Sequence, residues 1–195
     1  CGWGAVISEA ASHFGAQALG ITLSDEQLAW FQAGSIIPVA GAQMRLQHYH
    51  ALAESGETFD KIISIGMAEH VGRHRLPGYV EDVKTLLKPG GWGLIHCITG
   101  TVEEPTNPWL VKYIFPGGYI PTFNEMVREL SSQELVVLDA ENIGQHYALT
   151  LDKWLENFER NVDWVENRYG KEFVRMWRLY LQFSAASFRC EDTYV

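Results

Sequence analysis

The sequence predicts an α/β fold, a doubly wound and mostly parallel sheet covered by helices. Strand-like apolar runs alternate with helix-like amphipathic runs, as in successive βαβ units. The runs at 59–66 and 92–98 are almost continuously apolar, which is typical of strands buried on both faces. The chain also begins with Cys1-Gly2-Trp3-Gly4, which resembles the inside of a glycine-rich nucleotide loop without its preceding strand. A tight turn before a helix would explain these glycines equally well.

The first half of the chain predicts alternating helices and strands around one polar loop. The helices are expected at 5–13, 23–34 and 77–87, the strands at 17–22, 43–47, 59–66 and 92–98, and the loop at 51–58. Ala10, Ala11 and Phe14 would form the apolar side of the first helix. Ser24 and Gln27 have the spacing of a capping box. The sequence Lys-Pro-Gly-Gly at 88–91 is a strong helix stop.

The second half departs from this alternation. Residues 101–121 carry four prolines among aromatic residues, so this insert is expected as a lid or pocket wall, or as a packed surface loop. A helix at 123–130 and a strand at 134–142 follow, and then two long amphipathic helices at 151–169 and 171–189. Without repeats or a linker, the chain reads as one domain.

Composition argues against several classes of function. The 195 residues include 24 acidic and 15 basic side chains, a formal net charge of −9, with no basic stripe, so nucleic acid is not an expected partner. No apolar run approaches the roughly 20 residues that span a bilayer, and no segment resembles a signal peptide. Cys1, Cys97 and Cys190 lie far apart without metal-binding spacing, which indicates a reducing compartment and no metal site.

Seven motifs together cover nearly the whole chain. They are CGWG (1–4), GITLSDEQ (20–27), FDKIISIGMAEHVG (59–72), LLKPGGWGLIHCITG (86–100), YIFPGGYIP (113–121), HYALTLDKWLENFE (146–159) and FVRMWRLYL (173–181). In this order they resemble the cyclopropane fatty-acid synthase family of S-adenosylmethionine-dependent transferases, which includes the mycolic acid cyclopropane synthases. The LKPGG turn occurs in many class I methyltransferases, whereas GMAEHVG, IFPGGYIP and RMWRLYL together are more selective.

The resemblance implies a class I methyltransferase domain of the Rossmann-like type over 1–195, with the insert at about 101–121. Family members carry, before the first motif, an acyl-chain-handling helical segment, the first sheet strand and a short Tyr-Ser-Cys segment. Their last strand begins where this chain stops. We therefore expect a partial domain that lacks its first strand and most of its last, and that is inactive by itself.

The resemblance also implies an S-adenosylmethionine site at the ends of the first strands. Most doubly wound sites bind the ribose through an acidic residue about 20 positions past the glycine loop, where this chain has Thr22, Leu23 and Ser24. Helix capping alone accounts for Ser24 and Gln27, but the matching Thr and Gln of the family bind the cofactor. The expected cofactor residues are Gly2, Trp3, Gly4, Thr22, Leu23, Ser24, Gln27, Tyr49 and His50.

Within this site, the adenine is expected near the end of the third strand. The ring of Tyr49 can stack on the base. The family commonly has Asp-Tyr here, so His48 departs from its pattern and leaves the contact to the adenine amino group open.

Four further residues are implied to be catalytic. By themselves, His96 in an apolar strand and Tyr147 would be ordinary core residues. In the resembling family, however, the positions of Glu69, His96, Ile98 and Tyr147 surround a bound bicarbonate ion, which is the second expected cofactor. A cysteine from the segment before this chain completes the set in the family, and neither Cys1 nor Cys97 matches it.

The chemistry gives this arrangement a physical reason. Attack of an alkene on the sulfonium methyl leaves a carbocation, and ring closure then requires loss of a proton from the added methyl. A weak base in a dry site suits that step, and bicarbonate held by His96, Tyr147 and the Ile98 backbone would be that base, with Glu69 orienting it or stabilising nearby positive charge. Phe115, Tyr119, Tyr147 and Trp177 are candidates for cation–π support and for the acyl channel, or for plain packing.

We therefore expect transfer of a methylene group from S-adenosylmethionine to the cis double bond of an unsaturated phospholipid acyl chain. The reaction would take place at the membrane surface, with the protein cytoplasmic and peripheral to the inner face. Two alternatives stay open. One is a fatty-acid C-methyltransferase that makes a branched methyl lipid, and the other is an inactive fragment or lipid-binding module. A homodimer is a possible assembly.

Overall fold

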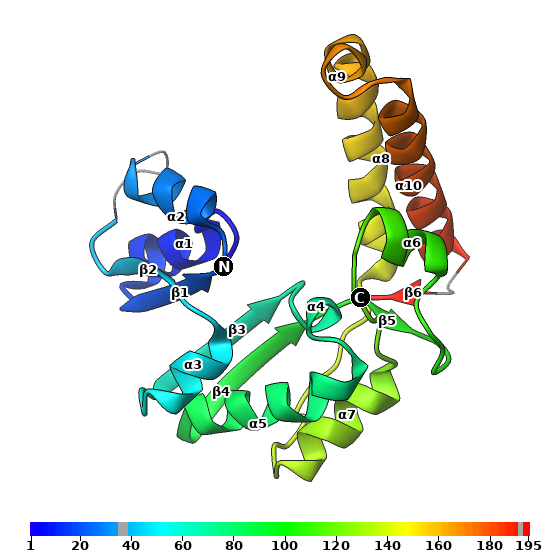
Figure 1. Ribbon diagram of the computed structural model, residues 1–195. Coiled ribbons are helices and arrows are strands. Elements are labelled where there is room, and N and C mark those ends of the chain that lie inside the picture. The colour runs from blue at the N-terminus through cyan, green and yellow to red at the C-terminus, as the bar shows by residue number, and fades with distance from the viewer. Residues whose placement is uncertain (35–38, 191–192) are drawn as a thin grey trace. The chain divides into compact units, whose positions relative to one another are not determined.

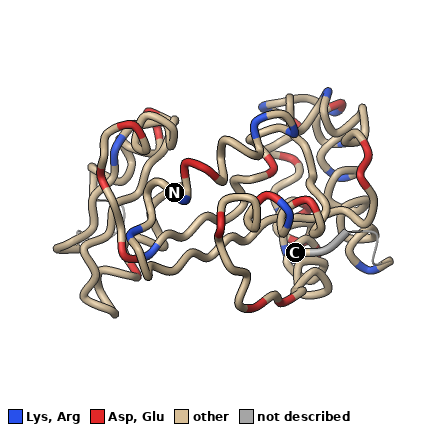
Figure 2. The backbone as a smooth tube through the Cα atoms, turned by 90° about the horizontal axis from the view of Figure 1, so that it is seen from below, with Lys and Arg blue, Asp and Glu red and all other residues tan. Residues whose placement is uncertain are grey.

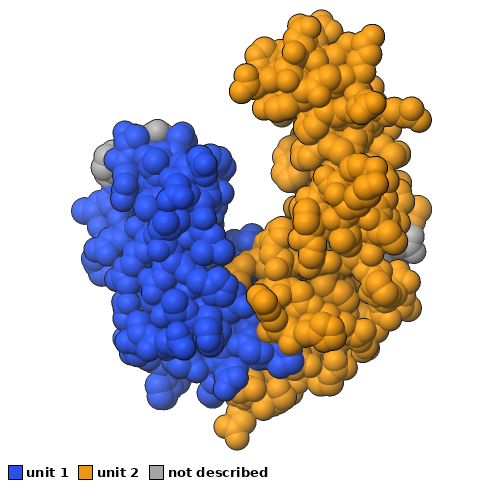
Figure 3. Space-filling view, in the orientation of Figure 1, with its two compact units in different colours: residues 1–65, 77–95 blue, residues 66–76, 96–195 orange. Residues whose placement is uncertain are grey.

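The computed structural model describes residues 1–34, 39–190 and 193–195. These residues form two compact units, the first made of 1–65 and 77–95 and the second of 66–76 and 96–195 (Figure 3). All nine expected cofactor residues belong to the first unit, and all four expected catalytic residues belong to the second. The assignment of 1–195 to one partial domain stays a prediction.

The first unit alternates helices and strands as predicted. Its elements are α1 (Ala5–Phe14), β1 (Ala18–Thr22), α2 (Asp25–Gln32), β2 (Ala42–Leu46), α3 (Tyr49–Glu54), β3 (Phe59–Ile65), α5 (Leu76–Leu86) and β4 (Leu87–His96). β1 and β2 pair in parallel, with Ala18 opposite Ala42 and Thr22 opposite Leu46. β3 and β4 form a second pair, and Figure 1 shows them running in the same direction. Parallel pairing places the ends of neighbouring strands at one edge, where ligands of such folds bind.

A small apolar core joins the two strand pairs of the first unit. Leu52 and Ala53 of α3 and Leu86 of α5 are buried, and they pack with partly buried side chains of β1 and β3, namely Leu19, Ile21, Phe59 and Ile62. On β3, Ser64 accepts a hydrogen bond of 2.8 Å from the Tyr79 hydroxyl of α5. One face of β3 is therefore covered by α5.

The other face of the β3–β4 pair differs from the prediction. Ile63 and Ile65 of β3 and Trp92 and Leu94 of β4 are each more than half exposed. Alternate residues of a strand point to opposite faces, so the residues next to Ile62 and Ser64 point away from α5. The expectation that both strands are buried on both faces was therefore wrong.

Two local predictions in the first unit are also wrong. The predicted polar loop at 51–58 begins with the helical residues of α3, which starts after His48, whose side chain accepts a bond from the His50 amide. Phe14, predicted on the apolar side of α1, is 81% exposed, whereas Ala11 is buried. Phe14 is the last helical residue before the left-handed Gly15, so it projects beyond the part of α1 that packs.

The second unit is mostly helical. Its elements are α4 (Ala68–Val71), the 3-10 turn η1 (Arg73–Arg75), β5 (Thr99–Gly100), α6 (Pro108–Tyr113), α7 (Phe123–Ser132), α8 (Gly144–Arg160), α9 (Val162–Tyr169), α10 (Lys171–Arg189) and β6 (Thr193–Tyr194). α8 and α10 run side by side in opposite directions, with α9 at the tip of this hairpin (Figure 1). β5 and β6 pair antiparallel.

The helical hairpin contains the main core of the second unit. Its buried residues come from the facing sides of α8 and α10: Ala148, Leu151, Phe158, Val174, Leu181, Ala185 and Phe188. The pair Arg178–Glu159 and the pair Arg189–Asp152 join the two helices at their borders. These ion pairs are largely exposed, so the free energy of the hairpin comes mainly from the apolar side chains.

Two predictions in the second unit are wrong. The apolar segment 134–142 forms no strand, and Val136 and Leu138 are exposed. A β-prone segment becomes a strand only when another strand pairs with it, and none of the described residues does so here. The predicted helix at 151–169 starts earlier, at Gly144, and is interrupted at Asn161 between α8 and α9.

Two further features concern the distribution of charged residues and the apolar character of the helices. Acidic and basic residues are interspersed along the backbone in Figure 2, in keeping with the 24 acidic and 15 basic side chains. Among the described residues, no helix combines the length and the apolar character that crossing a bilayer requires.

The hairpin core makes a direct prediction about stability. Leu151 is 1% exposed, whereas Leu149 on the same helix is 61% exposed. We expect Leu151→Ala to lower the free energy of unfolding by about 2–5 kcal/mol, because it removes buried contacts and leaves a cavity. Leu149→Ala is the matched control and should change it by about 0.5 kcal/mol or less. Urea denaturation followed by circular dichroism measures both, and equal effects would contradict the placement of the core.

Candidate functional site

The glycine loop of the first unit lies beside the end of β1. The amino group of Cys1 donates to the Ile21 carbonyl at 2.7 Å, and the Gly4 amide closes a turn on the Cys1 carbonyl at 3.1 Å. Gly4 has a φ of +92°, and a Cβ there would lie 2.5 Å from the Phe31 ring, so only glycine fits without a shift. Gly4 also caps α1 without a side-chain bond. The N–H groups at the start of α1 are therefore available for a polar ligand.

Thr22 and Gln27 form the polar part of this group. The Thr22 hydroxyl, which is buried, donates to the side-chain oxygen of Gln27 at 2.5 Å. Ser24 caps α2 by accepting from the Gln27 amide at 3.2 Å. The predicted capping box is therefore half formed, because the side chain of Gln27 turns to Thr22 and not back to Ser24. Leu23 between them is exposed.

Trp3 completes the contact between the glycine loop and α2. Its ring packs edge-on against Trp30, with the centroids 5.4 Å apart, and half of the side chain is exposed. The loop, the end of β1 and the start of α2 thus come together, which brings seven of the nine expected cofactor residues into one group.

Tyr49 and His50 follow β2 at the start of α3. The Tyr49 ring lies 4.3 Å from the His48 ring and edge-on to Tyr79 at 5.7 Å. His50 Nδ1 lies 2.9 Å from a carboxylate oxygen of the buried Asp82. This hydrogen bond and the charge of Asp82 raise the pKa of His50 above its ordinary value. Asp82 was missed by the sequence analysis, because nothing in its local pattern marks it as a partner of His50.

The group of predicted catalytic residues in the second unit, called the catalytic group below, is built around Glu69. Glu69 lies in the short helix α4, and its Oε1 atom accepts a hydrogen bond of 2.8 Å from the Ile98 amide. The Gly66 amide donates to the His96 carbonyl at 2.9 Å, which joins the same two segments three residues before Glu69 and two residues before Ile98. The structure therefore brings Glu69, His96 and Ile98 together. The Ile98 amide, expected to hold bicarbonate, is engaged by Glu69 instead.

Two buried polar atoms stand out in this group. Glu69 Oε2 and His96 Nδ1 are both buried, and neither forms a hydrogen bond with any described residue. Unsatisfied buried polar atoms are rare and cost about 1–3 kcal/mol each. A ligand that supplies both a donor and an acceptor would remove this cost.

Tyr147 belongs to the same surroundings. Tyr147 and Ile98 both pack against the core of the α8–α10 hairpin, and the Tyr147 ring lies 5.0 Å from that of Phe188. Burial, and after it the charge of Glu69, raise the pKa of Tyr147. The phenol is therefore protonated at neutral pH and can donate a hydrogen bond. All four predicted catalytic residues are thus associated, although their roles stay predictions.

The aromatic residues suggested for the acyl channel separate into two places. Phe115 packs edge-on between His70 at 5.8 Å and Tyr180 at 5.9 Å, and Tyr180 in turn contacts Trp177 at 5.2 Å. These rings form one continuous series that begins next to Glu69. Tyr119 lies apart from this series, in a polar network with Glu125. Glu125 is not among the residues predicted from the sequence, although Thr122 and Glu125 have capping-box spacing.

The fold and these two groups of residues define the class of the protein, a class I S-adenosylmethionine-dependent methyltransferase. The cyclopropane synthase MmaA2 from Mycobacterium tuberculosis superposes with a TM-score of 0.89 at 26% identity, over the whole of this chain and 73% of the solved one. The mycolic acid cyclopropane synthase CmaA1 complexed with SAH and CTAB gives 0.88 at 26% identity, with the same coverage. The predicted fold class is confirmed.

The family follows from the sequence comparisons. The family model of mycolic acid cyclopropane synthetase matches residues 1–195, and the chain belongs to this family. It is 34% identical to the cyclopropane-fatty-acyl-phospholipid synthase of Escherichia coli strain K12, over 98% of this chain and 49% of that protein. A probable fatty acid methyltransferase of Mycobacterium tuberculosis is also 34% identical, over 96% of this chain and 44% of its own length. The chain thus spans about half the length of these relatives.

The position of Glu69 beside Tyr147 makes an electrostatic prediction. Glu69→Gln removes the negative charge that opposes ionisation of Tyr147, so the pKa of Tyr147 should fall, while burial continues to hold it above the ordinary value for tyrosine. Ultraviolet difference titration of tyrosinate, compared with Tyr147→Phe to assign the signal, measures the change. The matched control is Glu129→Gln, an isosteric change on α7. A Tyr147 pKa that is the same in wild type and Glu69→Gln would contradict the arrangement.

Proposed function

We propose that this chain provides the cofactor and catalytic residues of an enzyme that converts a cis double bond of a phospholipid acyl chain into a cyclopropane ring. The methylene carbon comes from S-adenosylmethionine, so the products are the cyclopropane lipid, S-adenosylhomocysteine and one proton. The observation that carries the proposal is that two buried atoms, Glu69 Oε2 and His96 Nδ1, have no hydrogen-bond partner among the described residues, while the charge of Glu69 acts on the protonated Tyr147.

The first unit supplies the residues suited to S-adenosylmethionine. When bound, this cofactor supplies an electrophilic methyl group. The open start of α1 after Gly4 and the paired side chains of Thr22 and Gln27 offer the N–H, hydroxyl and amide groups that an amino-acid tail and a ribose require. Tyr49 offers an aromatic face for the adenine. The choice of S-adenosylmethionine as the cofactor is also supported by the similar synthase CmaA1, which was solved with SAH.

The second unit supplies residues that fit bicarbonate. When bound, this ion supplies a weak base. Glu69 Oε2 accepts a hydrogen bond, the Tyr147 hydroxyl donates one, and His96 Nδ1 takes either role according to its tautomer. A bicarbonate ion has both an O–H group and acceptor oxygens, so its hydrogen-bonding groups match this set.

The surroundings of these residues suit a carbocation. Tyr147 and Ile98 pack against the buried core of the α8–α10 hairpin, so one wall of the group is apolar. Such a wall limits the access of water, which would trap the cation. The Glu69 carboxylate, held by the Ile98 amide, stabilises positive charge and orients the base. His96 and Tyr147 hold the proton acceptor in place.

A related reaction is the second candidate. Loss of the proton from the lipid chain, and not from the added methyl, would leave a branched lipid without a ring. The similarity to a probable fatty acid methyltransferase, and to the tuberculostearic acid methyltransferase UfaA1 of Mycobacterium tuberculosis at 32% identity, favours keeping this alternative. Both reactions use the same residues, so the product distinguishes them.

The lipid substrate suggests where the protein works. Because the acyl chains lie in a bilayer, we propose that the enzyme acts at the inner face of the cytoplasmic membrane, as a peripheral protein. The phospholipid substrate is supported by the Escherichia coli relative, whose name specifies a fatty acyl phospholipid.

Mass spectrometry of lipids tests the proposed function. Cells that express the complete gene that encodes this chain should accumulate a lipid heavier by one CH2 group and lacking the double bond. His96→Ala should lower the amount formed per unit of enzyme by about 100- to 10,000-fold, the usual contribution of acid–base groups.

His74→Ala is the matched control, because His74 is exposed in the same unit. It should leave the product unchanged. A branched methyl lipid would favour the methyltransferase alternative. No new lipid with the wild-type gene, or equal product from His96→Ala, would contradict the proposal.

A further inference from the structure

We infer that the buried pair of Tyr119 and Glu125 positions the Glu69 carboxylate, an inference that rests on the catalytic role proposed above for Glu69. Neither residue is among the four of the catalytic group. They act through the segment 119–122. This segment is hydrogen-bonded both to the segment that carries Glu69 and to the segment that carries Ile98, the two that the Glu69–Ile98 bond joins. They are therefore positioning residues, not catalytic ones.

The segment 119–122 holds both sides of the catalytic group. On one side, the Tyr119 amide donates to the carbonyl of Glu69 itself at 2.9 Å. On the other, the Gly100 amide donates to the Pro121 carbonyl at 2.9 Å, and Gly100 forms a parallel bridge with Thr122. Gly100 lies two residues after Ile98. Displacement of this segment would therefore shift Glu69 and Ile98 relative to each other.

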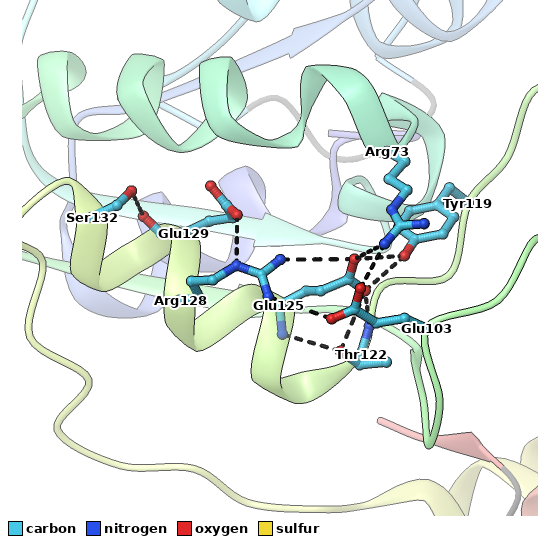
Figure 4. A network of polar contacts seen from close by, with 8 residues as sticks. All are labelled: Arg73, Glu103, Tyr119, Thr122, Glu125, Arg128, Glu129 and Ser132. Carbon is cyan, nitrogen blue, oxygen red and sulfur yellow. Dashed lines mark hydrogen bonds and ion pairs between the residues drawn. The ribbon is translucent and has the colours of Figure 1, made fainter.

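Glu125 fixes that segment at both ends. Its carboxylate accepts hydrogen bonds from the Tyr119 hydroxyl, at 2.8 and 2.7 Å to its two oxygens, and from the Thr122 amide at 2.9 Å. Thr122 in turn accepts from the Glu125 amide and caps α7 in a complete capping box. Figure 4 shows the hydroxyl of Tyr119 and the side chain of Thr122 directed at this carboxylate.

Arg73 connects the same carboxylate to the chain that carries Glu69. Its guanidinium lies 3.3 Å from Glu125, 2.6 Å from Glu103, and over the Tyr119 ring at 5.6 Å from the centroid (Figure 4). Arg73 is four residues after Glu69. The Glu69 segment is thus attached twice, once through the Tyr119 amide and once through the charge of Arg73.

The charge states of Glu125 and Tyr119 preserve their hydrogen bond near neutral pH. Glu125 is 2% exposed, and burial would raise its pKa, but the hydrogen bonds from Thr122 and Tyr119 and the charge of Arg73 outweigh burial and hold the pKa below its usual value. Burial, together with the hydrogen bond to Glu125, raises the pKa of Tyr119 to about 12. The carboxylate accepts and the phenol donates over a wide range of pH.

Hydrogen exchange of the Ile98 amide tests the inference without any assay of activity. This amide is held by Glu69 Oε1, so its exchange rate reports how well the carboxylate is placed. Tyr119→Phe removes only the hydroxyl, whereas Glu125→Gln removes the charge and replaces one acceptor oxygen by an NH2 donor. In both variants we expect the Ile98 amide to exchange about tenfold faster, relative to the Leu151 amide in the core of α8, because one hydrogen bond is weakened.

Matched substitutions separate positioning from general loss of stability. Tyr113→Phe changes an exposed tyrosine of the same insert, and Glu129→Gln changes a glutamate of the same helix that pairs with Arg128. Neither should alter the Ile98 rate relative to Leu151. An unchanged ratio in Tyr119→Phe, or equal acceleration of both amides, would overturn the inference. Should Glu125→Gln fail to fold, the milder Tyr119→Phe still decides the question.

The lipid assay then separates this inference from the proposed function. If both hold, Tyr119→Phe lowers kcat by about tenfold with KM unchanged, a smaller loss than that of Glu69→Gln. If the Ile98 ratio changes while Glu69→Gln forms wild-type amounts of product, the pair does position the carboxylate and the catalytic role of Glu69 is wrong.

Discussion

The hydrogen bond from the Ile98 amide to the Glu69 carboxylate is the interaction around which the candidate site of the second unit is arranged. It joins the short helix α4 to the chain that leaves β4, two segments that lie 29 residues apart in the sequence. The insert continues from one of these segments and returns to bond to both of them through residues 119–122. The insert therefore serves as a support for the catalytic group as well as a surface segment.

The same bond explains why the group is incomplete by itself. With Glu69 Oε1 engaged by Ile98, its second oxygen is left buried without a partner in the part of the chain that the structure describes, as is His96 Nδ1. A fold that only needed stability would gain by replacing such atoms with apolar ones. Keeping them beside the apolar wall of Tyr147 and Phe188 is physically reasonable when a small polar ligand completes the set. This contrast with the fully satisfied Glu125, where every oxygen has partners, separates a binding group from a structural one.

The sequence predicted the alternating elements well, and the places where it failed have physical causes. Strands β1 to β4 and most helices were predicted from periodicity and from stop signals such as Lys-Pro-Gly-Gly, which act locally. The prediction of a strand at 134–142 was wrong because strand formation depends on a partner strand, which the local sequence does not specify. The prediction that β3 is buried on both faces was wrong for the same reason, because Ile63 and Ile65 are exposed. Apolar character shows which residues could be buried, and it does not show what covers them.

The candidate site shows the same division. The identity of its residues came from motifs that match a family, and the structure added the contacts between them. The role of Glu125 and Tyr119 was predictable only in part. The capping box is visible in the sequence, but the connection of this pair to Glu69 passes through a backbone hydrogen bond. The engagement of the Ile98 amide by Glu69, and the pairing of His50 with Asp82, depend on packing that no local pattern encodes.

The central claim is that Glu69, His96 and Tyr147 form a site for a small oxyanion, and direct binding tests it best. Carbon-13 NMR of labelled bicarbonate, titrated with the protein, reports binding without requiring lipid or catalysis. The account predicts broadening of the bicarbonate signal by the wild-type chain, and its loss in Glu69→Gln and in Tyr147→Phe. A signal that is unaffected by the wild-type protein, or affected equally by the variants, would contradict it.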